Sequence, residues 1–181
     1  MRDQENIPDR ESSCRRPYVP RIRFRLGVAA LLAVFLQLLA LFFPFGADLP
    51  HRILFLVSYP VLFIFVLANV RRPGLVILGI GLVLNFLPIA ANGGLMPITP
   101  ETLARSGGVP EDAEVGHWLE GTKDVLVERE DAHLHFLADR LVVEEIDPPI
   151  RAFSIGDVFV AFGLLVTAGE VLLGQFRPTE T

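Results

Sequence analysis

Three stretches of eighteen residues in this sequence contain no charged side chain. They cover residues 26–43, 53–70 and 74–91, and a fourth stretch of the same length, 158–175, contains a single charge, that of Glu170. A helix of about 20 residues spans the hydrocarbon core of a bilayer, and slightly shorter helices are accommodated by local thinning. Because backbone amides in lipid must be paired within their own segment, each stretch is expected to form a helix. The sequence therefore predicts an all-α membrane protein with four transmembrane helices.

The charged residues are distributed so unevenly that they predict an orientation in the membrane. Residues 15–25 contain five arginines and no acidic residue, whereas residues 92–154 contain 13 acidic and 5 basic residues. Arginine and lysine near the ends of transmembrane helices favour the cytoplasmic side. We therefore expect both termini and the turn at 71–73 in the cytoplasm, and the long acidic segment on the outer side of the cell membrane.

This pattern divides the chain into five segments. They are a disordered basic cytoplasmic tail (1–25), the first three transmembrane helices (26–91), an extracytoplasmic acidic cap (92–154), the fourth transmembrane helix (155–176) and a short cytoplasmic tail (177–181).

The acidic cap is expected to be small and of mixed α/β structure. Thr99 and Pro100 are typical of the N-cap and first position of a short helix, and a second short helix is expected over residues 110–119. Strand-like composition is found at 124–128, 133–139 and 140–145. Two or three such strands are only marginally stable alone, so we expect them to lie on the outer ends of the helices.

One face of the third apolar stretch carries small, polar and helix-bending residues. Spacings of three and four residues place on this face Gly74, Leu78, Gly81, Asn85, Pro88 and Asn92. Small residues let helices approach closely, and an amide at membrane depth bonds to a partner on the next helix. We expect Asn85 to point into the helix bundle, either in an interhelical hydrogen bond or in contact with a ligand or ion.

The fourth helix begins at the same membrane face where the third one ends. Ser154 and Asp157 match the S-x-x-D capping box, in which each side chain accepts a hydrogen bond from the free backbone amide of the other. Gly93 can adopt a positive φ, which lets the chain turn as soon as the third helix ends. These signals predict a polar cluster near the outer leaflet, between the third and fourth transmembrane helices, that is either a structural staple or a ligand site. Its candidate residues are Asn85, Asn92, Gly93, Gly94, Met96, Pro97, Ser154 and Asp157.

Two other sets of ionisable side chains are candidates for function. Glu170 is an intramembrane carboxylate, which is interpreted either as a partner of arginines at the cytoplasmic interface or as a functional group. Asp131, His133 and His135 alternate, so on a strand they would share one face and could bind zinc or copper. A solvated face of a hairpin carries the same residue types, which leaves both interpretations open.

Two stretches of the sequence resemble a family of small bacterial integral membrane proteins classed as domain of unknown function 5317. They are LNFLPIAANGGLMPITPETLARSG and AFSIGDVFVAFG, which contain the motifs N-G-G-x-M-P and F-S-I-G-D-V. The resemblance covers roughly residues 26–175. It implies a membrane protein of a few helices and a bacterial source, and it brings no known activity.

The sequence leaves three hypotheses for function. It contains no Walker loop, nucleophile elbow, C-x-x-C, H-E-x-x-H or G-x-G-x-x-G motif. The first hypothesis is a non-enzymatic protein whose partners are the lipid bilayer and another membrane or envelope protein. The second is a carrier or sensor of a small ligand near the outer face, and the third is an enzyme that uses Asp157 with His133 or His135. No cofactor is expected. Nucleic acid is not expected as a partner either, because the basic patch is a short tail beside a membrane.

Overall fold

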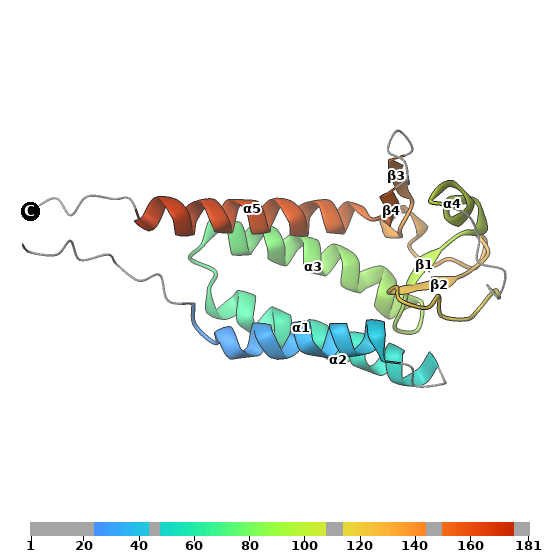
Figure 1. Cartoon of the computed structure of the whole chain (residues 1–181), viewed down its shortest axis with the longest axis horizontal. Coiled ribbons are helices and arrows are strands. Elements are labelled where there is room, and N and C mark those ends of the chain that lie inside the picture. The colour runs from blue at the N-terminus through green and yellow to red at the C-terminus, as the bar shows by residue number, and fades with distance from the viewer. Residues whose placement is uncertain (1–23, 44–47, 108–113, 144–149, 176–181) are drawn as a thin grey trace, which may run out of the picture.

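The computed structural model describes residues 24–43, 48–107, 114–143 and 150–175. Four long helices lie side by side along one axis, with short strands and turns gathered at one end (Figure 1). The long helices are α1 (Gly27–Phe42), α2 (Asp48–Ala68), α3 (Pro73–Ala91) and α5 (Ile155–Gln175). The chain is therefore mostly helical, as the apolar stretches predict.

Three of these helices, α2, α3 and α5, are long and apolar enough to cross a membrane. The remaining one, α1, is apolar but has only 16 residues. The structure thus provides three candidate membrane spans among the described residues, one fewer than the sequence predicts.

The ends of α3 and α5 follow local sequence signals. Pro73 occupies the first turn of α3, where its missing N–H is not needed. At the other end Gly93 and Gly94 have φ of 74° and 103°, and the Gly94 N–H donates to the carbonyl of Ile89, which closes the helix. Residues immediately after α3 therefore leave the helix axis at once.

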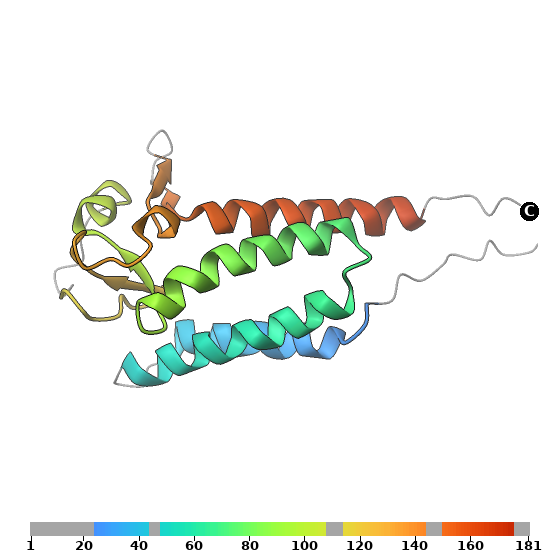
Figure 2. The same ribbon diagram turned by 180° about the vertical axis from the view of Figure 1, so that it is seen from behind.

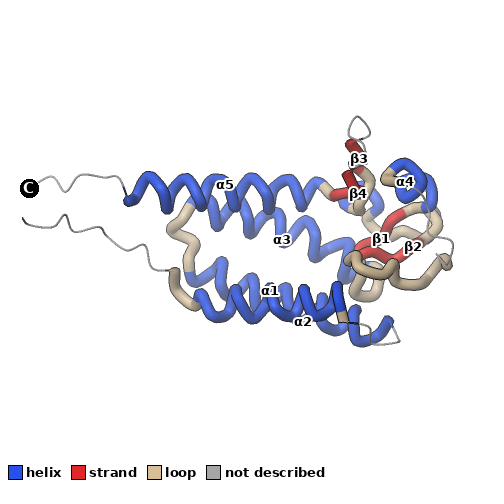
Figure 3. Tube along the Cα trace, in the orientation of Figure 1, coloured by secondary structure: helices blue, strands red, loops and turns tan. Residues whose placement is uncertain are grey.

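The residues between α3 and α5 form a small mixed structure, which we call the cap (Figure 3). Its elements are β1 (Met96–Ile98), α4 (Pro100–Arg105), β2 (Asp124–Leu126), the 3-10 turn η1 (His135–Leu137), β3 (Leu141–Val143) and β4 (Ile150–Phe153). The strands β1 and β2 pair in parallel, and β3 and β4 pair antiparallel. The cap is therefore built from two separate two-stranded ladders.

Two of the predictions for the cap are wrong. Residues 133–139 contain the 3-10 turn η1 and no strand, because Leu134 has a left-handed backbone (φ 55°) that interrupts any extended run. The second short helix was expected over 110–119, of which residues 110–113 lie outside the described residues. The described part, 114–119, contains no helix, and Trp118 there bridges to Val125.

The long helices pack in two pairs, α1 with α2 and α3 with α5 (Figure 2). The α3–α5 contact is made through glycines on both helices. A methyl group on Gly81 would lie 2.6 Å from the amide nitrogen of Val160, and one on Gly163 would lie 2.7 Å from the Cα of Leu78. The small-residue face of α3 is thus buried against α5, and the backbones approach too closely for any side chain at these positions.

Gly163→Ala is expected to destabilise the protein, whereas Gly169→Ala on the same helix is expected to keep or slightly raise its stability, because alanine is the better helix former. The added methyl at position 163 meets backbone atoms of α3, and overpacking of this kind costs about 1–3 kcal/mol. A methyl at position 169 meets nothing within 4 Å. Thermal unfolding of the two variants in detergent, followed by gel filtration of the soluble fraction, measures the difference. Equal melting temperatures would contradict the α3–α5 packing.

Candidate functional site

Asn85, Ser154 and Asp157 form one hydrogen-bonded group at the junction of α3 and α5. The side-chain amide of Asn85 donates to Oδ1 of Asp157 (2.6 Å), and the hydroxyl of Ser154 donates to Oδ1 of Asn85 (2.6 Å). The backbone amides of Ser154 and Asp157 each donate to the other residue's side chain at 3.0 Å. The α5 capping box and the buried amide of α3 are therefore a single structure.

Lys123 brings a positive charge from the cap into this group. It lies directly before β2, and its ammonium nitrogen is 2.6 Å from Oδ2 of Asp157 and 3.5 Å from Oδ2 of Asp139. Burial by itself would lower the pKa of Lys123, but the carboxylates of Asp139, Asp157 and Asp124 outweigh it and raise the pKa. Lys123 is thus held in its charged form by the acids that surround it.

Asp139 is the most deeply buried ionisable group of the arrangement. Its side chain is 1% exposed, and among the described residues no N–H or hydroxyl donates a hydrogen bond to either of its oxygens. Burial raises its pKa well above the usual value, Lys123 opposes this, and the nearby Asp124 and Asp157 raise it further. A proton on Asp139 also lets it hydrogen-bond to the carboxyl of Asp124. The cap therefore contributes a buried carboxyl group, that of Asp139, whose pKa is raised by its surroundings.

Tyr59 joins the same region from α2. Its ring is buried, with its centroid 5.5 Å from that of Phe86 on α3. It lies close enough to Lys123, Asp139 and Asp157 to interact with their charges. We call the resulting group the Lys123 cluster and define it by its members, Tyr59, Asn85, Lys123, Asp124, Asp139, Ser154 and Asp157.

The sequence alone does not reveal the cap members of this cluster. Lys123 is the only lysine in the chain, since arginines account for the other 15 of the 16 basic residues. That isolation is the one signal that could have singled it out, because a lysine ammonium is a compact charge that fits between several carboxylates. No spacing rule connects positions 123 and 139 to position 157, so their meeting depends on the folded cap.

Asn92 does not take part in the cluster, contrary to the grouping expected from the sequence. Its side-chain amide donates to the carbonyls of Pro88 (2.7 Å) and His133 (2.8 Å), and its Oδ1 accepts from the His133 N–H (3.0 Å). Asn92 thus fastens a cap loop to the end of α3. The neighbouring Gly93 forms the turn, and its carbonyl accepts a hydrogen bond from Arg52 at 3.2 Å.

The other candidate residues of the N-G-G-x-M-P stretch lie in the turn after α3 or in the strand β1. Gly94 continues the turn with a positive φ, and a methyl group on it would lie 2.9 Å from the backbone of Arg52. Met96 and Pro97 are in β1 and fully buried. They lie in the core on which the cap rests.

Glu170 lies at the opposite end of the helices. Its Oε1 accepts a hydrogen bond from the Gly74 N–H (2.9 Å), and its Oε2 is 4.0 Å from the guanidinium of Arg72. The carboxylate therefore satisfies a free amide in the first turn of α3 and sits near its positive dipole end. This arrangement agrees with the interfacial interpretation of Glu170.

The three residues considered for a metal are not arranged on a strand. Asp131 and His133 lie in a turn, and His135 begins η1. Nδ1 of His133 is 3.1 Å from the backbone carbonyl of Asp131. Within the described ranges, no three histidine, cysteine, aspartate or glutamate side chains gather as a metal site. The alternation that suggested shared ligation is therefore lost in the fold.

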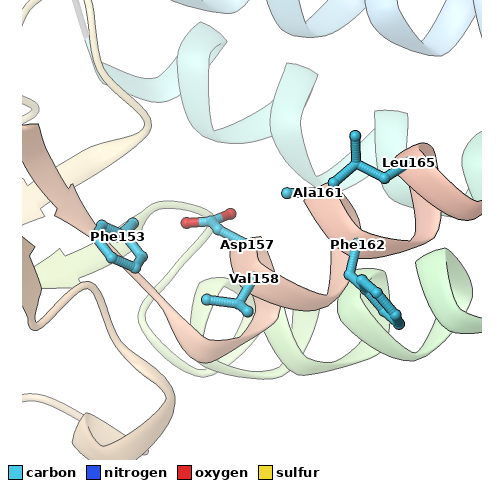
Figure 4. Close-up of a pocket in the computed structure, with 6 residues that line it drawn as sticks. All are labelled: Phe153, Asp157, Val158, Ala161, Phe162 and Leu165. Atoms are coloured by element: carbon cyan, nitrogen blue, oxygen red, sulfur yellow. The ribbon is translucent and has the colours of Figure 1, made fainter.

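An open groove of about 460 Å³ lies along the first half of α5 (Figure 4). It is lined by Phe153, Asp157, Val158, Ala161, Phe162 and Leu165. Its surface is apolar except at the Asp157 end, where it meets the Lys123 cluster. All of its lining residues come from β4 and α5, so it is not a pocket between α3 and α5.

Comparison with known proteins identifies the family. The model of a family of unknown function, DUF5317, matches residues 21–168. The chain belongs to this family. The resemblance inferred from the sequence is thereby confirmed, and it assigns no activity to the DUF5317 protein. No curated protein and no solved structure matches the chain.

The raised pKa of Asp139 predicts a pH dependence of stability in this DUF5317 protein. Above the usual value of 3.8 the unfolded chain releases the Asp139 proton while the folded protein keeps it, so stability falls as pH rises through the raised pKa. Asp139→Asn should flatten this slope, and Asp131→Asn, an exposed aspartate of the same region, should leave it intact. Melting temperatures measured from about pH 4 to pH 8 compare the slopes. Parallel curves for all three proteins would show that Asp139 is not the titrating group.

Proposed function

We propose that this DUF5317 protein is a four-span cell-membrane protein, both termini cytoplasmic, that acts without catalysis by binding another membrane or envelope protein. The observation that carries the proposal is the apolar groove on α5. Only 11% of the α5 span is buried within the protein, against 44% for α3, so most of α5 is available for contacts in the bilayer.

The shape of the groove favours a second helix as its occupant. Ala161 is its smallest lining residue and is flanked by the larger Phe162 and Leu165, which leaves a hollow between ridges. Helices associate in membranes through packing of this kind, where a small residue lets the partner approach.

A fourth span is supported by the position and surface of α1. Sixteen residues give a helix of about 24 Å, which a modest local thinning of the bilayer accommodates. The helix packs along α2, and its outer residues Val28, Leu31 and Phe42 are more than 70% exposed, as suits contact with lipid.

The charges at the two ends of the helices support the orientation. The guanidinium of Arg72 lies over the ring of Phe24 (4.8 Å) and near Glu170, at the end opposite the acidic cap. Arginines at this end favour the cytoplasm. With an even number of spans, the N- and C-terminal tails are placed on the same side.

The acid–base pair that the enzyme hypothesis requires, Asp157 with His133 or His135, is not formed among the described residues. Asp157 is engaged by Asn85, Lys123 and Ser154, and among the described residues no hydrogen bond or ion pair joins it to a histidine. His133 is held through its backbone by Asn92 instead.

The second candidate function, binding of a small ligand, is favoured by one feature of the same groove. The carboxylate of Asp157 lies at one end of this otherwise apolar groove (Figure 4). An amphiphile with an apolar chain matches this distribution of surface.

The proposed topology predicts the accessibility of two introduced cysteines. After replacement of Cys14, a cysteine at position 120 should react with a membrane-impermeant maleimide on intact cells, since Glu120 is exposed on the cap. A cysteine at position 5 should react only after the cells are opened. Labelling of position 5 but not of position 120 would reverse the orientation.

A photo-crosslinking amino acid at Leu165, which lines the groove, is expected to give a discrete protein adduct in intact cells. The adjacent Leu164 is also apolar and exposed but does not line the groove, so it serves as the matched control. Filling the groove with Ala161→Leu should abolish the adduct, whereas Ala168→Leu, also exposed on α5, should not.

Mass spectrometry of the adduct separates the two candidate functions. A protein adduct specific to position 165 supports partner binding, and a small-molecule adduct at the same position supports the amphiphile instead. Equal crosslinking at positions 164 and 165 would show that the groove has no occupant of its own.

A further inference from the structure

The cap loop that contains η1 lies at the end of the helix bundle where α3 ends and α5 begins (Figure 2). At its beginning, the backbone N–H and carbonyl of His133 are both bonded to the side chain of Asn92, the residue that ends α3. This two-sided contact holds the loop at the level of the last turn of α3.

The end of the same loop is fixed to the start of α5. The N–H of Arg140 donates to the carbonyl of Phe153 (3.3 Å), immediately before the capping box. Asp139 is paired with Lys123, which in turn is bonded to Asp157 in the first turn of α5. The residues between 133 and 139 are therefore confined to the level at which α3 ends and α5 begins.

Two large apolar side chains of this confined segment are exposed. Leu134 is 37% exposed and Phe136 is 58% exposed, whereas Leu137 and Ala138 are buried. Leu134 also has a φ of 55°, a left-handed conformation that is strained for a bulky residue and persists only where surrounding contacts impose it. The chain thus holds Leu134 in a backbone conformation that its residue type does not favour, with Phe136 exposed beside it in η1.

The segment is also free of charge. Between Asp131 and Asp139 the sequence contains no acidic residue, lysine or arginine. Burial lowers the pKa of His135, and Arg129 and Arg140 add to this against the opposing Glu101, so the ring of His135 is uncharged at neutral pH.

We propose that Leu134 and Phe136 insert into the lipid interface on the cap side of the membrane and form a wedge that seats the cap on the bilayer. Lipid is the occupant because the wedge is level with the ends of α3 and α5, and α5 continues from there with exposed apolar residues outside the groove, such as Phe159 and Leu164. Aromatic and aliphatic residues at this depth bury their apolar surface in the boundary between headgroups and acyl chains. The wedge does not depend on the groove or its partner.

Spin labels test this assignment in proteoliposomes. Labels are attached to single cysteines at position 136, at position 134 and at the exposed control position 130, in a protein without Cys14. At 136 and 134 we expect collisions with oxygen to rise and collisions with a water-soluble nickel complex to fall severalfold relative to 130. Two wedge positions are used so that a folding defect in one variant leaves the other informative.

The remaining outcomes overturn the proposal. If positions 136 and 134 collide with the nickel complex as often as position 130, the wedge lies in water. If both reagents are excluded there while 130 remains accessible, a protein surface covers the segment and not lipid. Gel filtration of each labelled variant confirms that it is folded before reconstitution.

Discussion

The carboxylate of Asp157 is the point at which the helices and the cap are joined. It accepts hydrogen bonds from Asn85 on α3, from Lys123 in the cap and from the backbone of Ser154 at the start of its own helix. A buried charge is costly unless it is paired and hydrogen-bonded, so these three donors must be present together. Removing one would leave a partly buried charge or an amide without its partner, since the side chains of Lys123 and Asp157 are 23% and 30% exposed. The junction is therefore stable only when α3, α5 and the cap are all in place.

This junction depends in turn on how closely α3 and α5 approach. A methyl group on Gly156 would collide with the side-chain oxygen of Asn85 and lie 2.7 Å from its Cγ. The glycine on α5 thus creates the space in which Asn85 can reach both Ser154 and Asp157. Helices associate in membranes through close backbone packing at small residues and through buried hydrogen bonds. Here both kinds of contact involve the same few residues.

The sequence predicts well what is determined locally and poorly what is determined by the folded cap. The apolar runs, the capping box at Ser154 and the small-residue face of α3 are patterns within single segments, and each appears in the structure. Lys123 and Asp139 reach Asp157 only through the parallel pairing of β1 with β2 and the turn at η1. Strands of three residues carry too little periodicity to be recognised, and a left-handed Leu134 contradicts the preference of its residue type. The expected role of Asn92 failed for the same reason, since its amide meets a loop that no local pattern places beside it.

The Lys123 cluster also sets the position of both surfaces for which a partner is proposed. Asp157 is at once a member of the cluster and the polar end of the α5 groove. Asp139 is a member of the cluster and the residue at which the wedge loop ends. The carboxyls of Asp124, Asp139 and Asp157 all interact with one ammonium group, that of Lys123, and burial raises the pKa of Asp139. Apolar packing joins the cap to the helices beside this cluster, since Met96 of β1 shares a buried core with Ile89 of α3, and Val125 of β2 shares one with Phe55 of α2. The groove and the wedge are consequently held in a fixed relation by the charged contacts of the cluster together with these buried cores.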